Sequence, residues 1–221
     1  EEGSCLMEKV FITDHVPFPK RRSDSHKGDY GKVGIIAGSR GMAGAGEMCT
    51  RSCLRSGAGI VTIACADCLT EVYETKLTEA MVRPLSDSEG HISSSAADEI
   101  LDFISDKECV LFGPGIGRSN DITDILSCIL RNYSGRLVID ADGLFALSKI
   151  RAELKETEAT VLITPHVGEM SRLTRLDASQ IKGRIAETAS EFAAEYGIFV
   201  LLKDFVSAIA APDGRVRLNT A

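Results

Sequence analysis

Apolar runs alternate with amphipathic stretches along most of the chain. Two such runs, residues 33–37 and 60–64, flank a glycine-rich turn and about ten residues of mostly small or helix-favouring type. Short apolar runs bounded by turn residues are typical of strands, and a strand, helix and strand in succession form a unit whose strands are parallel. We therefore predict a βαβ unit between His26 and Ala64.

The same alternation continues toward the C-terminal part of the chain. Further strands are predicted at residues 80–85, 109–112, 137–140, 160–164 and 199–204, and helices at residues 68–80, 93–105, 119–131 and 178–196. Serines offer an N-cap for the second of these helices, and Gly197 is placed to end the last. Residues 207–211 and 215–219 flank Pro-Asp-Gly and predict a hairpin. The pattern indicates an α/β protein with a mostly parallel central sheet and helices on both faces.

Polar residues and glycines follow the predicted strands. In parallel sheets ligands bind beyond the carboxyl ends of the strands, so these positions are the candidate site. They are Gly38–Gly46, Gly113–Gly117, Asp140 and Asp142, Thr164–Glu169, and Lys203.

The loop Gly38–Gly46 opens into a helix and is a candidate cradle for an anion, because glycine lets the backbone approach a ligand closely. The alternative is a strand-to-helix turn whose glycines serve packing alone. Neither G-x-G-x-x-G nor G-x-x-x-x-G-K-[ST] is present, so the loop matches no standard nucleotide motif.

The charged residues at the strand ends offer three kinds of chemistry. Asp140 and Asp142 lie two apart, so in an extended segment they would share a face and could hold Mg²⁺ or a ribose hydroxyl; the alternative is that one caps the following helix. His166 is predicted to lie in a loop, where it can donate to a phosphate or amide, and Glu169 to be a cap or structural partner rather than a base. Lys203 is a candidate phosphate contact.

Composition narrows the classes of partner. A net charge of −7 and a pI near 5.2 argue against nucleic acid and anionic membrane surfaces. Seven cysteines are an odd number, and no secretory signal or apolar run approaching about 18 residues is present. We therefore expect a cytoplasmic protein with reduced thiols. Cys65-Ala-Asp-Cys68 has no partner pair or histidine nearby, which argues against a metal or redox site.

Residues 1–25 carry no long periodic pattern and start with Glu rather than Met. We expect them to be a connector that enters the domain, residues 26–221, from an upstream domain.

Seven stretches, in the same order, resemble the motifs of one family, the NAD(P)H-hydrate dehydratases, which are ribokinase-like. They are HKGDYGKV, IIAGSRGMAGA, LRSGAGIVTI, GPGIG, VIDADGL, LITPHVGEM and VLLKDFVSAIAAPDG. The resemblance implies a repair enzyme, a carbon–oxygen lyase, that phosphorylates the hydroxyl of hydrated NADH or NADPH and eliminates phosphate. It implies ADP as phosphoryl donor, ATP as the less favoured one, and Mg²⁺ as cofactor.

The resemblance also implies residue roles. Gly44, Ala45, Gly115, Gly117, His166 and Glu169 correspond to positions that contact the hydrated dinucleotide. Lys203, Asp204, Phe205, Val206 and Ser207 correspond to the adenine-nucleotide site, with Asp140, Asp142 and Asn219 as auxiliary residues. The family has Lys-Gly where this chain has Lys203-Asp204, which puts a carboxylate near the nucleotide phosphates.

After the position of Asn219 the family continues into Gly-Thr/Ser-Gly-Asp, whose aspartate is the base, whereas the sequence ends at Ala221. We therefore expect residues 1–221 to be an incomplete domain, inactive alone. The resemblance further suggests a fused epimerase upstream and a homo-oligomer. The alternatives are a ribokinase-like kinase of a vitamin precursor or sugar, a non-catalytic nucleotide-binding module and, more distantly, a Rossmann dehydrogenase.

Overall fold

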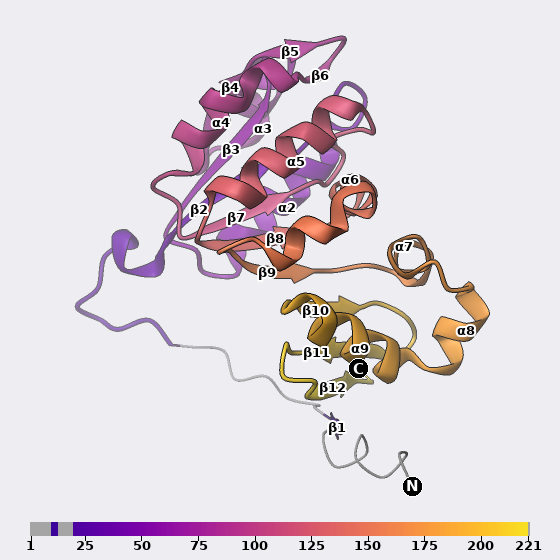
Figure 1. Ribbon diagram of the computed structural model, residues 1–221. Coiled ribbons are helices and arrows are strands. Elements are labelled where there is room, and N and C mark those ends of the chain that lie inside the picture. The colour runs from indigo at the N-terminus through magenta and orange to yellow at the C-terminus, as the bar shows by residue number, and fades with distance from the viewer. Residues whose placement is uncertain (1–9, 13–19, 221) are drawn as a thin grey trace, which may run out of the picture. The chain divides into compact units, whose positions relative to one another are not determined.

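Strand β2 (Lys32–Ile36) has a parallel neighbour on each side, as its apolar sequence predicts. The structure is a computed structural model that describes residues 10–12 and 20–220 (Figure 1). The chain divides into two units, Arg21–Ala159 (the larger unit) and Glu1–Lys20 with Thr160–Ala221 (the smaller unit), and each is described by itself.

In the larger unit the strands are hydrogen-bonded in the order β8, β7, β2, β3 and β4, and all four pairings are parallel. The bounds of the other strands are β3 (Ile60–Ala66), β4 (Met81–Leu85), β7 (Cys109–Phe112) and β8 (Arg136–Ile139). A small separate hairpin joins β5 (Asp87–Ser88) to β6 (His91–Ile92). The carboxyl ends of the parallel strands therefore lie along one edge.

Helices cover both faces of this sheet, because its strands are apolar on both sides. The helices of the larger unit are α2 (Ala43–Arg55), α3 (Thr70–Lys76), α4 (Ala97–Ile104), α5 (Asn120–Asn132) and α6 (Asp142–Ile150). Figure 1 shows α4 and α5 on the near side of the strands and α2 on the far side. Short 3₁₀ turns at residues 27–30, 67–69, 94–96 and 151–155 complete the unit.

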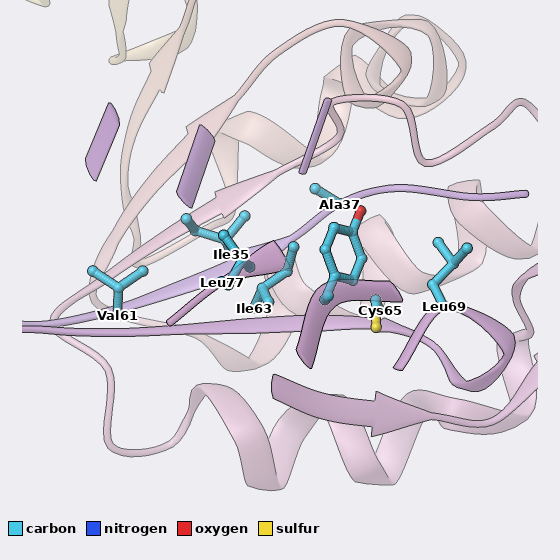
Figure 2. Packing of buried hydrophobic residues seen from close by; sticks show 8 residues of the cluster. Ile35, Ala37, Val61, Ile63, Cys65, Leu69 and Leu77 are labelled. Atoms are coloured by element: carbon cyan, nitrogen blue, oxygen red, sulfur yellow. The ribbon is translucent and has the colours of Figure 1, made fainter. Parts of the chain in front are cut away.

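One face of β2 and β3 builds the core under α2 and α3. Alternate residues of the two strands point to the same side, and Figure 2 shows Ile35, Ile63 and Leu77 close together, with Leu69 beside Cys65 at the other end of the cluster. Tyr73 is fully buried in this cluster and donates a hydrogen bond from its hydroxyl to the Ala43 carbonyl oxygen, 3.0 Å away. Burial without that bond would leave a polar group unsatisfied, so the bond fixes the start of α2 over the sheet.

The opposite face of β2 packs on α4. A Cβ at Gly34 would lie 3.0 Å from the Phe103 ring, so the helix approaches the strand closely at this glycine. On α5 the apolar residues Ile122, Ile125 and Leu126, which are spaced to share one face of a helix, are buried.

The smaller unit mixes parallel and antiparallel pairs. Its elements are β1 (Val10–Ile12), β9 (Thr160–Ile163), α7 (Val167–Thr174), α8 (Ala178–Gly183), α9 (Ile185–Tyr196), β10 (Phe199–Leu202), β11 (Ser207–Ala210) and β12 (Val216–Asn219). β9 is parallel to β10, β11 is antiparallel to both β10 and β12, and β1 is parallel to β12. Helix α9 covers one side of β10, β11 and β12, where Val200, Ala208, Ala210 and Val216 are buried.

The predicted fold class is confirmed, and so are the strands after residue 25 and the C-terminal hairpin. Ser93 caps a short 3₁₀ turn that leads into α4, and Gly197 ends α9 in the left-handed conformation. The single helix predicted over residues 178–196 was wrong: Arg184 leaves helical geometry (φ −142°, ψ 47°) directly after Gly183, a poor helix former, and separates α8 from α9.

The predicted connector, residues 1–25, falls partly outside the described residues. Within it, Val10–Ile12 forms β1, a strand too short for the sequence pattern to have indicated. Among the described residues, no helix combines the length and the apolar character that crossing a membrane requires.

Candidate functional site

In the larger unit, the loops that follow β2 and β7 are fastened to each other by their backbones. The N–H of Gly38 donates to the carbonyl oxygen of Pro114 at 2.9 Å, and the Ser39 hydroxyl donates to the carbonyl oxygen of Gly115 at 2.9 Å. The N–H of Gly113 donates to the carbonyl oxygen of Ile36 at 3.1 Å. The two glycine loops thus form one connected surface at the strand ends.

Two of the predicted substrate-contact residues meet on this surface. A Cβ at Gly115 would lie 2.8 Å from the Cβ of Ala45 and 3.0 Å from the Met42 carbonyl oxygen, so the second loop lies against the first turn of α2. Gly115 has a φ of +64°, which suits glycine. Gly44, by contrast, is exposed, and a side chain there would meet nothing within 4 Å.

The carboxylates that follow β8 are arranged differently from the prediction. Ala141 adopts a φ of 52° and a ψ of −120°, which turns the chain, and Asp142 becomes the first residue of α6. Asp140 Oδ1 accepts from the Ala141 N–H at 2.8 Å, while Asp142 accepts from the N–H of Gly117 at 3.2 Å and from Arg118 Nε at 2.8 Å.

The expectation that Asp140 and Asp142 share a face of an extended segment was therefore wrong, and neither side chain caps α6. Both oxygens of Asp142 are occupied by donors from the β7 loop, so the pair does not fit a Mg²⁺ site of its own. No group of three or more His, Cys, Asp or Glu side chains suited to a metal occurs among residues 20–220.

In the smaller unit, His166 is the N-cap of α7. Its Nδ1 accepts from the N–H groups of Gly168 (2.9 Å) and Glu169 (3.3 Å), and Glu169 Oε2 accepts from the His166 N–H at 2.9 Å. This reciprocal pair is a capping box, so Glu169 is the structural partner that the sequence predicted. Because Nδ1 accepts, the proton of the neutral ring lies on Nε2, which is 3.6 Å from Glu169 Oε1, and the imidazole side chain is 61% exposed.

Lys203 lies next to His166 because β9 and β10 are parallel. The two residues form an isolated parallel bridge, and the Lys203 N–H donates to the Pro165 carbonyl oxygen at 2.8 Å. Ser207 faces Asn219 across the β11–β12 pairing. Of the intervening residues, Asp204 is exposed and the Phe205 side chain is 95% exposed.

The structure thus groups the predicted residues within each unit. The larger unit holds Gly44, Ala45, Gly115, Gly117, Asp140 and Asp142, and the smaller unit holds His166, Glu169, Lys203, Asp204, Phe205, Val206, Ser207 and Asn219. In the larger unit they follow the carboxyl ends of parallel strands. In the smaller unit they follow β9, lie between β10 and β11, or form the paired ends of β11 and β12.

Sequence reasoning missed a pocket of about 150 Å³ beside Gly117 in the larger unit. We call it the arginine pocket. Its lining residues are Ser39, Arg40, Glu89, Gly90, His91, Gly117, Arg118 and Ser119. The available signal was that an arginine follows each of the glycine loops Gly38-Ser39 and Gly115-Ile-Gly117.

Another hollow, of about 300 Å³, lies in the smaller unit and is largely apolar. It is lined by Phe199, Ile209, Ala210, Ala211, Arg215 and Arg217. It contains none of the residues predicted to be in the site, so its size alone does not make it the functional centre.

Comparison with known proteins shows which family the chain belongs to. The model of the NAD(P)H-hydrate dehydratase family matches residues 33–221. The chain belongs to this family. It is 33% identical over 212 residues to a bifunctional NAD(P)H-hydrate repair enzyme of Thermofilum pendens, covering 96% of this chain and 40% of that protein.

Shorter relatives of the NAD(P)H-hydrate dehydratase family align over most of their length. The ADP-dependent (S)-NAD(P)H-hydrate dehydratase of Staphylococcus aureus is 29% identical, with 98% of this chain and 73% of that protein covered. The crystal structure of the ADP/ATP-dependent NAD(P)H-hydrate dehydratase of Bacillus subtilis, co-crystallised with ATP/Mg²⁺, superposes with a TM-score of 0.75 at 26% identity, covering 91% of this chain and 68% of that one.

These matches confirm the family resemblance and the ribokinase-like fold. The chain spans about two fifths of the length of several bifunctional relatives that it matches.

Proposed function

We propose that this chain forms the dehydratase part of a nicotinamide-nucleotide repair enzyme. Its substrate is hydrated NADH or NADPH, and its phosphoryl donor is ADP, with ATP less favoured. The observation that carries the proposal is the alignment of 98% of the chain with an ADP-dependent dehydratase.

The proposed reaction has two steps. The ring hydroxyl of the hydrated dinucleotide attacks the terminal phosphoryl group of ADP, and AMP leaves. Phosphate then departs from the ring carbon with the electrons of the carbon–oxygen bond, a proton is lost from the neighbouring carbon, and the dihydronicotinamide double bond is restored. Phosphoryl transfer of this kind depends chiefly on positioning and charge neutralisation.

The residues of the larger unit position the dinucleotide in this proposal. Gly44, Ala45, Gly115 and Gly117 present backbone and small side chains, which let a flat ring or phosphate approach closely. In the smaller unit, the largely exposed His166 imidazole donates to the substrate from Nε2–H, while the N–H groups of Gly168 and Glu169 hold the ring in that tautomer.

The segment from Lys203 to Ser207 binds the adenine nucleotide, with the Lys203 ammonium near its phosphates. Asp142 and Glu169 have their carboxylates engaged by neighbouring N–H groups, so we assign neither as the general base. No group of three or more side chains suited to a metal occurs among the residues that the structure describes, so in this proposal Mg²⁺ enters with the nucleotide.

Four wider expectations belong to the same proposal. The protein works in the cytoplasm, forms a homo-oligomer, continues beyond residue 221 into the segment that carries the base, and is fused to an upstream epimerase. The bifunctional names of several relatives support the last of these.

The test is recovery of dihydronicotinamide absorbance when the full-length natural protein is given hydrated NADH or NADPH with Mg²⁺ and either ADP or ATP. We expect recovery with both substrates, and a lower rate for His166→Ala than for wild type. No recovery with either nucleotide would reject the dehydratase and make small-molecule kinase substrates the next assay.

A single substitution tests the effect of Asp204, which stands where the family has glycine after the lysine. Asp204→Gly restores the family pair and removes a carboxylate that repels nucleotide phosphates. We expect ADP to bind about fivefold tighter, which corresponds to about 1 kcal/mol for one exposed charge. Asp213→Gly, which removes an exposed carboxylate from the β11–β12 turn, is the control and should leave the affinity for ADP unchanged. Equal affinity in Asp204→Gly and wild type would place the phosphates away from residue 204.

A further inference from the structure

The arginine pocket is a built feature of the larger unit. The N–H of Arg40 donates to the carbonyl oxygen of Gly90 at 2.7 Å, which fastens the first glycine loop to the β5–β6 hairpin. Gly90 has a φ of +89°, and a Cβ there would lie 2.6 Å from the Cβ of Arg40. The hairpin therefore fits against Arg40 only with glycine at its turn, and one wall of the pocket is fixed by backbone contacts.

The opposite wall holds a second guanidinium in place. Arg118 donates from Nε to Asp142 at 2.8 Å and lies over the Phe145 ring, with 5.0 Å from Cζ to the ring centroid. The other oxygen of Asp142 accepts the N–H of Gly117. Within residues 20–220 the terminal amino groups of Arg118 make no hydrogen bond, so they are available to an incoming acceptor.

The carboxylates around the pocket are largely engaged by other donors. Hydrogen bonds from Cys68, and to a smaller extent the nearby Arg40 guanidinium, hold the pKa of Asp87 below its usual value, and hydrogen bonds from Ser94 do the same for the pKa of Asp121. His91 Nε2 lies 3.9 Å from Asp121 Oδ2. Glu89 is therefore the carboxylate of the lining whose charge opposes an anion most directly, against the two guanidinium groups.

The start of α5 adds a further positive element. Ser119, which lines the pocket, is the N-cap of this 13-residue helix, and its side chain accepts the N–H of Ile122. The N-terminal end of a helix carries a partial positive charge that favours anions.

We propose that the arginine pocket binds a phosphate group of the hydrated dinucleotide through Arg40 and Arg118. This inference rests on the proposed function, in which Gly117, a lining residue, contacts that substrate. A phosphate matches the planar donors of two guanidinium groups better than an uncharged group does. The phosphate comes either from the diphosphate of both substrates or from the 2′-phosphate that only NADPH hydrate carries, and the two sources are separable by experiment.

The experiment measures binding by calorimetry with the full-length protein and no adenine nucleotide, so that no turnover occurs. Hydrated NADH and hydrated NADPH are titrated into wild type, Arg40→Gln, Arg118→Gln and Glu89→Gln. Arg118→Lys tests whether a positive charge at residue 118 is enough for binding. The matched control is Arg83→Gln, which removes an exposed arginine of β4 that pairs with Asp102 of α4.

We expect Arg40→Gln and Arg118→Gln each to weaken binding about tenfold or more, since charge-assisted hydrogen bonds are lost. Glu89→Gln should tighten binding, Arg118→Lys should fall between wild type and Arg118→Gln, and Arg83→Gln should match wild type. Equal losses for the two hydrates identify the diphosphate, and a loss confined to NADPH hydrate identifies the 2′-phosphate.

The inference fails if both glutamine variants bind both hydrates as wild type does, or if they weaken only the binding of ADP, titrated separately. Wild type that binds neither hydrate rejects the proposed function instead. Unfolding midpoints of every variant show whether a loss of binding reflects a loss of folded protein.

Discussion

The strand ends of the two units are fixed in place by different means. In the larger unit, the loops after β2, β7 and β8 pack backbone against backbone, and glycines with positive φ fill positions that admit no side chain. In the smaller unit, the start of α7 is fixed by a side-chain capping box between His166 and Glu169. The first arrangement is sensitive to any added atom, whereas the second is sensitive to the chemistry of two side chains.

The comparison has a functional meaning under the proposed function. Glycine loops that admit no side chain offer the substrate a fixed surface of peptide groups. A capping histidine combines two tasks, because Nδ1 stabilises a helix start while the rest of the ring stays largely exposed and carries Nε2–H for the proposed substrate.

Gly113→Ala tests the larger unit most severely. Gly113 has a φ of +123°, and a Cβ there would lie 2.2 Å from the Asp140 carbonyl oxygen and 2.6 Å from the Gly143 nitrogen. Because backbone atoms cannot move aside cheaply, we expect a loss of about 3 kcal/mol or more in the free energy of unfolding, measured with urea.

The control is Gly44→Ala, at the same edge but in the first turn of α2, where a Cβ meets nothing within 4 Å. It should be neutral or stabilising by up to about 1 kcal/mol, since alanine favours helix. If the two alanine variants were equally stable, close backbone packing would not govern this edge.

His166→Ala tests the smaller unit at the corresponding place. It removes the acceptor of two N–H groups at the start of α7, so we expect unfolding to become about 1 kcal/mol easier. His166→Asn retains a capping acceptor and should recover most of that stability while lacking the imidazole Nε2–H. An Asn variant as unstable as the Ala variant would mean that the cap contributes nothing.

Periodicity predicted the parallel strands because burial on both faces leaves a direct record in the sequence, as in Val33–Ala37 and Cys109–Phe112. The sequence also placed His166 and Lys203 at strand ends, and the structure brings the two residues together in an isolated parallel bridge. That they are neighbours follows from the parallel direction of β9 and β10.

Backbone conformation at single residues was beyond the sequence pattern. Nothing in Asp140-Ala-Asp142 indicates that an alanine adopts a positive φ, and that one torsion moves Asp142 into α6 and onto Gly117. The β5–β6 hairpin, which completes the arginine pocket, has strands of two residues each, too short to show periodicity.

Alkaline pH should sharpen the contrast between the units, because all cysteines among residues 20–220 lie in the larger one. Burial, followed by the neighbouring Cys109 and Cys49, raises the pKa of Cys53 from near 9 to about 11. The folded state therefore holds this proton more tightly than the unfolded state, so the stability it contributes is complete below about pH 9 and is lost as pH rises toward 11.

We expect this loss to be about 1 kcal/mol, with allowance for the partial exposure of the thiol. The measurement is the urea midpoint of wild type and Cys53→Ala at pH 8 and at about pH 10.5, a value inside the titration interval. Cys53→Ala should lose less stability than wild type over that interval, and identical slopes would show that Cys53 is not the titrating group.

Phe205→Ser should have the smallest effect on stability. The ring is 95% exposed and contributes almost no buried area, so we expect the free energy of unfolding to change by less than about 0.5 kcal/mol. Phe103→Ala, which removes a ring packed on Gly34, should cost about 3 kcal/mol or more and shows that the assay detects a buried ring. Because Phe205 lies in the segment proposed to bind the nucleotide, Phe205→Ser should still weaken the binding of ADP, by about threefold. A folded variant with unchanged affinity for ADP would remove residue 205 from the proposed nucleotide site and leave Lys203 and Ser207 to define it.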